Sequence, residues 1–480
     1  MKSSRAWRAF PLFLLLVALA IYGRSLSGPF LNWDDNIYIT GSRIVWNLSW
    51  DTVAQAFGGI QFTDYAPLNT IGLALQYKLW GPWVTGFRIT NILLHVLNAS
   101  LVFGILSALL CRRPLAAAGA LVFLSHPVQV EVVAWVSQHK TLLSSSLMLA
   151  SLLMHLQRKP RGLVAALAIA GMLVKPQAVV LPLMLVAADV FADRKRLLPA
   201  IADQIPLFLF AAAVAAANLF TQGLASTITP PHGGILSHAW GVLQLPGRYA
   251  VKLFAPYDLC ALYNYDHMTA ASVFFVLGTA VIVAVLSLAI KRERRLQALG
   301  VAWFLIALLP VLNLVPMVIW MADRYLYVPM LGVLLAAGSL VPTGMAGWRR
   351  AFAFVAVFTA VMILAAHSIF QSRIWVSDSA LWTDTWSKSP GVVAGTNLAS
   401  ALAAEGRLAD ALTYADWVVN TAPNRARGWA IRGEIKRRAG LYRDASRDFE
   451  KAVRLDSSRT VYVDALVESL DSMKGRPAAD

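Results

Sequence analysis

The chain has 480 residues, of which only 14% are Asp, Glu, Lys or Arg and 58% are hydrophobic. Soluble globular proteins have about 25% charged residues, so the composition excludes a water-soluble enzyme and indicates a polytopic membrane protein. The net charge of +16 does not indicate a nucleic-acid partner, because the basic residues stand between apolar runs and not on one soluble face. The two cysteines, Cys111 and Cys260, exclude a disulfide framework and a cysteine metal cage.

Apolar runs that approach the roughly 20 residues needed to cross a bilayer recur from Trp7 to about Phe370, and then they stop. We therefore expect an all-α chain with a membrane domain over residues 1–370 and a soluble domain over 371–480. About eleven spans are expected, near residues 7–22, 89–110, 114–125 with its continuation, 141–156, 162–174, 177–191, 198–220, 272–290, 297–318, 325–341 and 351–370. A further apolar helix over 239–255 is expected at the membrane surface, because it carries basic residues.

Short basic loops set the expected orientation. With the N-terminus in the cytoplasm, 17 of the 26 basic residues of the membrane domain lie in cytoplasmic segments, as the positive-inside rule requires. This orientation needs residues 162–191 to cross twice, because a single broken span there would turn the Arg194–Arg196 loop outward. A cleaved signal peptide in place of the first span would leave the later orientations unchanged. The soluble domain is then extracytoplasmic.

Three acidic residues stand out on the expected outer side. Asp34 and Asp35 are adjacent in the first outer loop, where they either take part in chemistry or only cap a helix and face solvent. Glu131 lies in an apolar setting between His126 and His139. Because an ionisable residue at membrane depth is costly to desolvate, Glu131 is expected either to form a structural ion pair or to take part in function.

Outward-facing basic residues are few, namely Arg88, Lys140, Lys175 and Arg324. Each of them is either an anchor at the membrane interface or, together with the others, part of a binding site for a lipid phosphate. The second span also carries Asn91, His95 and Asn98, which share one helical face with Arg88 at spacings of three and four residues. Such side chains either hydrogen-bond between packed helices or contact a substrate.

Motifs for a tight metal site or a nucleotide are missing from the sequence. There is no His-Glu-x-x-His motif, no pair of cysteines and no dense cluster of carboxylates. A weakly held divalent cation, Mg or Mn, at Asp34, Asp35 and Glu131 is left open. No P-loop or GxGxxG motif occurs between a strand and a helix, so no nucleotide substrate is indicated.

The soluble domain repeats itself with a period of 34 residues, since Gly406 recurs as Gly440 and Ala411 as Ala445. A period of 34 is that of tetratricopeptide repeats, which are helical hairpins; two unrelated amphipathic hairpins are the alternative. Stable arrays need about three stacked units. We therefore expect the segments 377–388 and 462–473 to cap the two clear repeats.

Several blocks follow one another in a specific order: FRITNILLHVLNASLVF, LSHPVQVEVVAWVSQHKTLLS, LVKPQAVVLPLMLVAADV, MADRYLYVPMLGV and LWTDTWSKSP. In this order they resemble the bacterial members of the transmembrane and tetratricopeptide-repeat protein O-mannosyltransferase family, which belongs to the C-type glycosyltransferase superfamily. The resemblance runs from about Phe30 into the repeats. Where the family usually has SERKDLLS, this chain reads SQHKTLLS, which retains only Lys140 among the charged residues.

The resemblance implies an integral enzyme of the bacterial inner membrane that takes a sugar from a polyprenyl-phosphate carrier at the outer leaflet. It implies a catalytic base in the first outer loop, which is Asp34 or Asp35 here, and it places Glu131 and Arg324 at positions of family motifs. The chemistry agrees, because a carboxylate can deprotonate an acceptor hydroxyl and fixed cations can stabilise the departing phosphate. The expected cations are Lys140, Lys175, Arg324 and Arg88, and the expected further substrate contacts are His126, His139, Asn91 and His95.

We therefore expect a glycosyltransferase that acts by single displacement with inversion and modifies a protein or peptide bound by the repeats. Other readings are a glycosyltransferase acting on an envelope glycan, a transporter or flippase for the same lipid-linked sugars, and a scaffold whose working part is the repeat domain. A transporter would place charges near the midplane of broken helices in two related halves. The sequence shows no internal repeat in the membrane domain, and its acids lie in outer loops.

Overall fold

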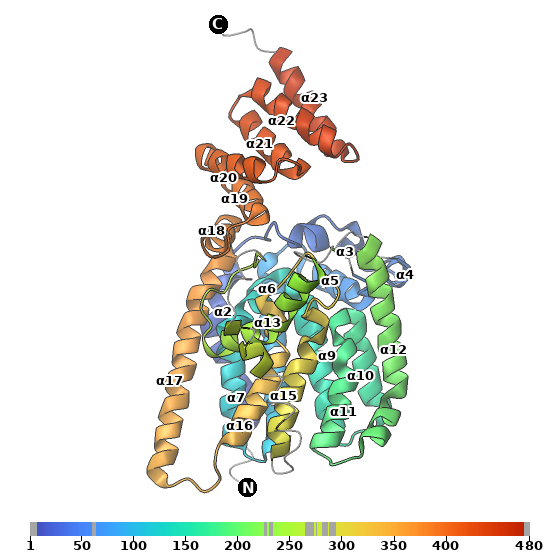
Figure 1. Ribbon diagram of the computed structural model, residues 1–480, viewed down its shortest axis with the longest axis vertical. Coiled ribbons are helices and arrows are strands. Elements are labelled where there is room, and N and C mark those ends of the chain that lie inside the picture. The colour runs from blue at the N-terminus through green and yellow to red at the C-terminus, as the bar shows by residue number, and fades with distance from the viewer. Residues whose placement is uncertain are drawn as a thin grey trace. The chain divides into compact units, whose positions relative to one another are not determined.

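The structure is a computed structural model that describes residues 7–59, 64–224, 228–229, 234–264, 273–274, 276–280, 287 and 294–474. Its regular secondary structure is helical throughout the described residues (Figure 1). The chain divides into two compact units, the first made of Met1–Leu259 and Met268–Val376 and the second of Cys260–His267 and Ser377–Asp480. The division after Val376 lies shortly beyond the end of the last apolar run at Phe370.

The first unit is a bundle of apolar helices. Its main members are α2 (Phe10–Tyr22), α6 (Val84–Leu110), α7 (Arg113–Ser125), α9 (His139–Leu156), α10 (Arg161–Val174), α11 (Leu181–Phe191), α12 (Leu197–Leu224), α13 (Ile235–Phe254), α15 (Arg295–Leu308), α16 (Pro329–Leu340) and α17 (Gly347–Ser372). Four helical segments in the described part are long and apolar enough to cross a membrane, Phe10–Ser27, Val84–Leu110, Leu197–Leu224 and Gly347–Val376, and the bent pair Arg113–Ser125 and Pro127–Ala134 is a fifth candidate. The unit is therefore a membrane-protein bundle by length and composition.

Each expected span except 272–290, which lies mostly outside the described residues, corresponds to a helix. Several bounds differ from these expectations, and for three of them the local reason is evident. Helix α6 begins at Val84, directly after a turn in which Gly81 has a φ of 58°. Helix α15 ends at Leu308, short of the expected 318, because Pro310 cannot continue an α-helix. Helix α16 begins only at Pro329, since the preceding residues Asp323–Leu326 form a 3₁₀ turn.

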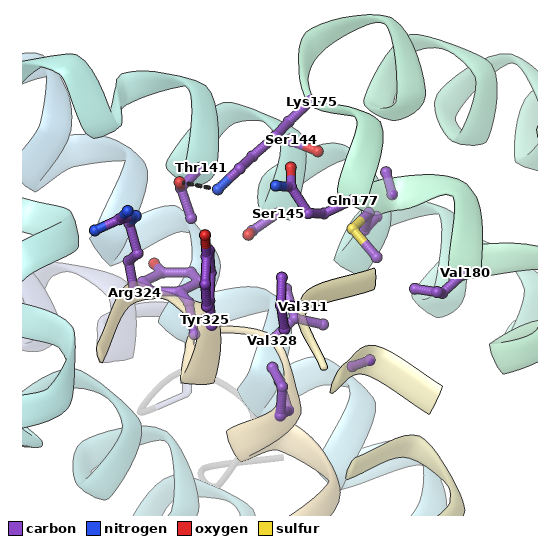
Figure 2. Close-up of a pocket in the computed structure, with 15 residues that line it drawn as sticks. Thr141, Ser144, Ser145, Lys175, Gln177, Val180, Val311, Arg324, Tyr325 and Val328 are labelled. Atoms are coloured by element: carbon purple, nitrogen blue, oxygen red, sulfur yellow. Dashed lines mark hydrogen bonds between the residues drawn. The ribbon is translucent and has the colours of Figure 1, made fainter. Parts of the chain in front are cut away.

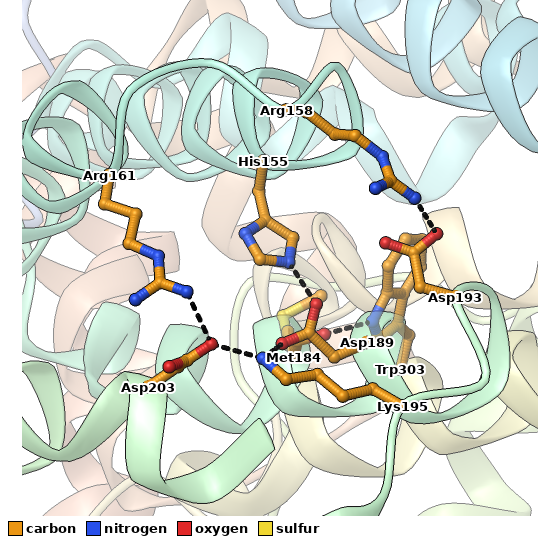
Figure 3. Close-up of polar contacts among 9 residues, drawn as sticks. All are labelled: His155, Arg158, Arg161, Met184, Asp189, Asp193, Lys195, Asp203 and Trp303. Atoms are coloured by element: carbon orange, nitrogen blue, oxygen red, sulfur yellow. Dashed lines mark hydrogen bonds and ion pairs between the residues drawn. The ribbon is translucent and has the colours of Figure 1, made fainter. Parts of the chain in front are cut away.

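Residues 162–191 fold back on themselves. Arg161, at the start of α10, pairs with Asp203 of α12 at 2.8 Å, and Lys195, just after α11, pairs with the same Asp203. The start of α10 and the end of α11 therefore lie at the same end of the bundle, where Figure 3 shows these side chains gathered. Helices α10 and α11 therefore run in opposite directions, while the number of times that residues 162–191 cross the membrane stays a prediction.

Close helix contacts in the first unit use small residues. A Cβ built at Gly300 of α15 would lie 2.5 Å from the carbonyl oxygen of Gly332 of α16, so no larger residue fits at that crossing. Small residues at helix crossings are typical of membrane bundles, in which close backbone approach replaces the hydrophobic effect as the driving force. Helix α6 packs against α2, α7 and α9 at the centre of the unit.

The segment between α2 and α6 builds one end of the first unit. It contains the π-helical turn η2 (Asn36–Thr40) and the short helices α3 (Arg43–Trp46), α4 (Trp50–Gly58) and α5 (Pro67–Trp80). A buried apolar cluster fixes this segment to the bundle, and its members are Tyr38, Ile39, Val45, Leu73, Phe87 and Val136. The loop that carries Asp34 and Asp35 is therefore held on a packed support and not free in solvent.

The second unit consists of antiparallel helices: α18 (Asp378–Lys388), α19 (Val392–Ala404), α20 (Leu408–Thr421), α21 (Ala426–Arg438), α22 (Tyr442–Leu455) and α23 (Thr460–Lys474). Helices α19, α21 and α23 begin at residues 392, 426 and 460, so each start follows the previous one by 34 residues. Gly406 and Gly440 turn the two hairpins with φ near 80°, a conformation that favours glycine. The helix starts thus reproduce the period seen in the sequence, while the assignment as tetratricopeptide repeats stays a prediction.

Candidate functional site

Asp35 is fully buried beside the turn η2 and is held by three hydrogen bonds. Its Oδ2 accepts from the backbone N of Leu31 at 2.9 Å, and its Oδ1 accepts from the backbone N of Ser137 at 2.9 Å and from the Ser137 hydroxyl. Burial raises the pKa of the Asp35 carboxyl to about 6, although the hydrogen bonds from Ser137 and Leu31 lower it. With both oxygens occupied, Asp35 ties the first loop to the turn Val136–Gln138.

Asp34 differs from its neighbour in having an open carboxylate. It is half-buried, and within the described part of the chain its side chain accepts no hydrogen bond. Burial raises the pKa of the Asp34 carboxyl, whereas Lys140 and Arg324 lower it and Asp64 raises it further. A carboxylate with free lone pairs, a raised pKa and cations nearby has the properties of a general base.

Lys140 is buried at the first turn of α9, where it joins two other elements. Its Nζ donates to Asp64 Oδ2 at 3.2 Å and to Tyr38 Oη at 3.0 Å, and it lies 4.5 Å from the centroid of the Tyr38 ring. Sequence reasoning did not single out Asp64 or Tyr38. The available signal was the scarcity of acids, since the first 370 residues contain only 12 Asp and Glu. Lys140 thus brings Asp64 into the neighbourhood of Asp34.

Glu131 and Arg324 form a buried ion pair between short helical turns. Arg324 Nη1 lies 2.5 Å from Glu131 Oε1, and the backbone N of Arg324 donates to Glu131 Oε2 at 2.8 Å. The side chains are only 3% and 7% exposed. Arg324 also lies 5.6 Å from the ring of Trp135 and 5.1 Å from that of Tyr325. Glu131 therefore orients Arg324, which agrees with the ion-pair alternative for this residue.

A small cavity lies beside Arg324 and is lined by the polar side chains of Thr141, Ser144, Ser145, Lys175, Gln177 and Tyr325 (Figure 2). Lys175 Nζ donates to Thr141 Oγ1 at 2.6 Å, and no protein atom pairs with the buried Oε1 of Gln177 in the described part of the chain. Burial, together with the neighbouring Lys140 and Arg324 cations, lowers the pKa of Lys175. The cavity measures about 40 Å³; since one water needs about 10–15 Å³, it has room for a few waters but not for a hexose ring.

Three of the four predicted phosphate-binding cations thus lie together, and Arg88 lies apart from them. The Arg88 guanidinium is fully buried and donates to the carbonyl oxygens of Gly28 at 2.6 Å and Pro29 at 2.8 Å. These contacts hold in place the loop residues Gly28 and Pro29, which precede Asp34 in the chain. Arg88 therefore has a structural role. Its contact with a lipid phosphate stays a prediction.

The polar face of α6 makes contacts between helices. Asn91 Nδ2 donates to the Trp135 carbonyl oxygen at 3.1 Å, and His95 hydrogen-bonds through Nδ1 to Tyr327 Oη at 2.7 Å and through Nε2 to the Leu124 carbonyl oxygen at 3.1 Å. All are buried. Such bonds satisfy polar groups inside a membrane bundle, so the described contacts of Asn91 and His95 agree with the packing alternative.

The two histidines on either side of Glu131 have different surroundings. His126 accepts at Nδ1 from the backbone N of Val128 at 3.2 Å and hydrogen-bonds through Nε2 to the Leu253 carbonyl oxygen at 3.0 Å. His139 is buried against Gly72, and neither ring nitrogen has a hydrogen-bond partner among the described residues. Neither histidine lines the cavity beside Arg324, and their substrate contacts stay predictions.

The three carboxylates suggested for a divalent cation do not suit that role together. Asp35 is occupied by Leu31 and Ser137, and Glu131 is occupied by Arg324. No group of three or more His, Cys, Asp or Glu residues suited to a metal occurs among the residues that the structure describes. Asp35 and Glu131 are therefore not available as metal ligands in this arrangement.

Comparison with known proteins gave one distant similarity. Over 215 residues the chain is 28% identical to protein O-mannosyl-transferase Tmtc2 of Drosophila melanogaster, and the match covers 39% of this chain and 23% of that protein. The matched part is thus about a quarter of the length of the curated relative. No protein-family model and no solved structure matches the chain. The similarity supports a glycosyltransferase and leaves its donor and acceptor undefined.

Proposed function

We propose that the chain is a membrane glycosyltransferase that moves a sugar from a polyprenyl-phosphate-linked donor to a hydroxyl acceptor, with inversion, at the outer face of the bacterial inner membrane. The similarity to Tmtc2 supports the glycosyltransferase class, and the long apolar helices support the membrane location. One observation supports the mechanism most directly: the Asp34 carboxylate accepts no hydrogen bond from the described residues and interacts electrostatically with the Lys140 and Arg324 cations.

In the proposed step, the acceptor oxygen attacks the anomeric carbon of the donor sugar. The bond between that carbon and the phosphate oxygen breaks, and Asp34 takes the proton of the acceptor hydroxyl. The polyprenyl phosphate leaves with one additional negative charge, which Lys175 and Arg324 beside the cavity are placed to stabilise. A single displacement inverts the anomeric centre without a covalent intermediate on the protein.

Other charged residues act through these groups. We assign the base to Asp34, because Asp35 already accepts three hydrogen bonds. Asp35 is a positioning residue that holds the loop, and Glu131 positions Arg324. The lowered pKa of Lys175 suits a phosphate site, because an arriving anion favours protonation of the amine.

We further propose that the second unit binds the acceptor, a protein or peptide. Two hollows on this unit, of about 340 and 120 Å³, share Arg425 and Arg427 in their lining. Stacked helical hairpins present extended surfaces of this kind to chain segments. The proposed reaction is therefore protein O-glycosylation, and an envelope glycan is the alternative acceptor.

The decisive experiment compares Asp34→Asn with Asp51→Asn in proteoliposomes supplied with radiolabelled polyprenyl-phosphate hexoses and acceptor protein. Loss of a general base lowers the rate by about 10²- to 10⁴-fold, so transfer by Asp34→Asn should fall by that factor. Asp51 is an exposed carboxylate in the first turn of α4, and its variant should transfer normally. Wild-type transfer by Asp34→Asn would refute the mechanism, and label that crosses the membrane while remaining on lipid would indicate a flippase.

The acceptor is tested in cells with and without the chain. Intact-mass and glycan profiles of envelope proteins should lose one specific hexose or N-acetylhexosamine when the chain is deleted. A change confined to lipopolysaccharide would reassign the acceptor from protein to glycan while leaving the donor chemistry in place.

A further inference from the structure

A second and larger cavity lies at the opposite end of the first unit from Asp34. It measures about 540 Å³ and forms where the ends of α6, α9, α11, α15 and α16 meet. Arg194 and Arg295 line it together with Asp193 and the polar side chains of Gln297 and Ser339. The two cavities lie toward opposite ends of α9, because Thr141, near its start, lines the first cavity and Leu156, at its end, lines the second.

The acids at this end are already neutralised by other cations. Asp193 pairs with Arg158 at 3.5 Å, while Asp189 and Asp203 both pair with Lys195 (Figure 3). Asp203 is further bound by Arg161 and Asp189 by His155. Arg194 and Arg295 take no part in this network, and neither has a carboxylate partner within the described ranges of the chain. Among the described residues, the cavity therefore carries two guanidinium groups without a carboxylate partner, beside an Asp193 whose carboxylate is paired with Arg158.

The rest of the lining indicates the chemistry of the ligand. Guanidinium groups match phosphate oxygens with paired, charge-assisted hydrogen bonds, and Gln297 supplies a further polar group. The cavity is also lined by the apolar side chains of Leu109, Phe191 and Leu296. A small, freely soluble phosphate compound has no apolar group to pack against them. Basic pockets between the ends of membrane helices suit lipid headgroups. The joint polar and apolar lining therefore favours an amphiphile over inorganic phosphate.

We propose that this cavity binds the phosphate headgroup of an anionic phospholipid, with Arg194 and Arg295 on the phosphate and an acyl chain against Leu109 and Phe191. The site is independent of the glycosyl transfer proposed above. It stabilises the junction of helix ends that come from distant parts of the sequence. It uses phospholipid as a structural ligand and not as a substrate.

Native mass spectrometry of the full chain released from nanodiscs tests the proposal, with phosphatidylglycerol and phosphatidylcholine as the probes. The wild type should retain phosphatidylglycerol in preference. The double variant Arg194→Gln/Arg295→Gln should bind phosphatidylglycerol about 100-fold more weakly, because each of the two charge-assisted bonds is worth at least about tenfold in affinity. The matched control is Arg349→Gln with Arg350→Gln, which removes two exposed arginines of α17 outside the cavity.

Equal retention of phosphatidylglycerol by the wild type and the Arg194/Arg295 variant would overturn the proposal, as would an equal loss in the control. Inorganic phosphate provides a third arm. If millimolar phosphate protects the wild type from thermal unfolding while phosphatidylglycerol does not, the site takes a soluble anion and the lipid proposal fails. Glycosyl transfer by the variants is measured separately, so a failure of the lipid site does not bear on Asp34.

Discussion

The two ends of the first unit hold similar charges in opposite environments. At one end, Asp189, Asp193 and Asp203 meet Arg158, Arg161 and Lys195. Arg158 and Arg161 are about 80% exposed there, at 79% and 82%. At the other end, Asp34, Asp64 and Glu131 meet Lys140, Lys175 and Arg324. Lys140 and Arg324 are 11% and 7% exposed.

This difference separates charges that function from charges that only keep a surface solvated. Exposed ion pairs cost little to form and contribute little, so the Arg158–Asp193 and Arg161–Asp203 pairs need no explanation beyond solubility and orientation. Asp189 at the same end is only 7% exposed, but both His155 and Lys195 pair with it. Buried charges are costly, and at the Asp34 end the cost is not fully offset, because the Asp34 carboxylate accepts no hydrogen bond from the described residues. Uncompensated buried charge is expected where a substrate supplies the missing partner.

Breaking the Glu131–Arg324 pair should have the largest effect on stability. Glu131→Gln leaves the Arg324 guanidinium buried without its counter-charge, which costs about 3–5 kcal/mol. Thermal unfolding in detergent measures the loss. Glu131→Gln combined with Arg324→Gln should recover most of it, because both charges are then gone. A single variant as stable as the wild type would contradict the burial of this ion pair inside the protein.

Lys175→Met should affect transfer more than stability. A charge-assisted hydrogen bond to phosphate is worth about 1.5–3 kcal/mol, so transfer should fall about 10- to 100-fold. The melting temperature should not fall, since an apolar side chain replaces a buried cation. Lys159→Met, at an exposed position of the opposite end, serves as the control. An unchanged transfer rate would remove Lys175 from the phosphate site.

The pH dependence of transfer tests the link between Lys140 and Asp34. A general base must be ionised, so burial, which raises the pKa of Asp34, should place the acidic limb of log(kcat/KM) above the ordinary value for aspartate. Lys140 lowers that pKa, and Lys140→Gln should therefore move the limb to higher pH. Lys78→Gln, an exposed change on α5, should not move it. A limb that stays in place in Lys140→Gln would show that Asp34 is not the titrating base.

Hydropathy was sufficient to predict the long apolar helices, because the length of an apolar run is a local property of the sequence. It did not predict the short helices α3, α4 and α5 beside the site. The roles of Asp34 and Asp35 were not predictable in this way. The two residues are adjacent and chemically identical, and what distinguishes them is Ser137, which lies 102 residues beyond Asp35. Likewise, the partner of Glu131 lies 193 residues away. Composition and periodicity do not reveal such long-range pairings. The sequence could therefore identify the candidate residues, but it could not distinguish the general base from the residues that position it.

The smallest effect is expected at the opposite end of the bundle. Arg158→Gln with Asp193→Asn removes an ion pair whose side chains are 79% and 43% exposed, with 3.5 Å between Arg158 Nη2 and Asp193 Oδ1. Pairs of this kind contribute about 0–1 kcal/mol, so unfolding and transfer should both stay close to wild type. The loss of stability in this variant and in Glu131→Gln should also be compared at low and high salt, because salt screens exposed ion pairs much more than buried ones. A large loss of stability here would show that the exposed network holds the helix ends together, and the contrast between the two ends would then be one of function alone.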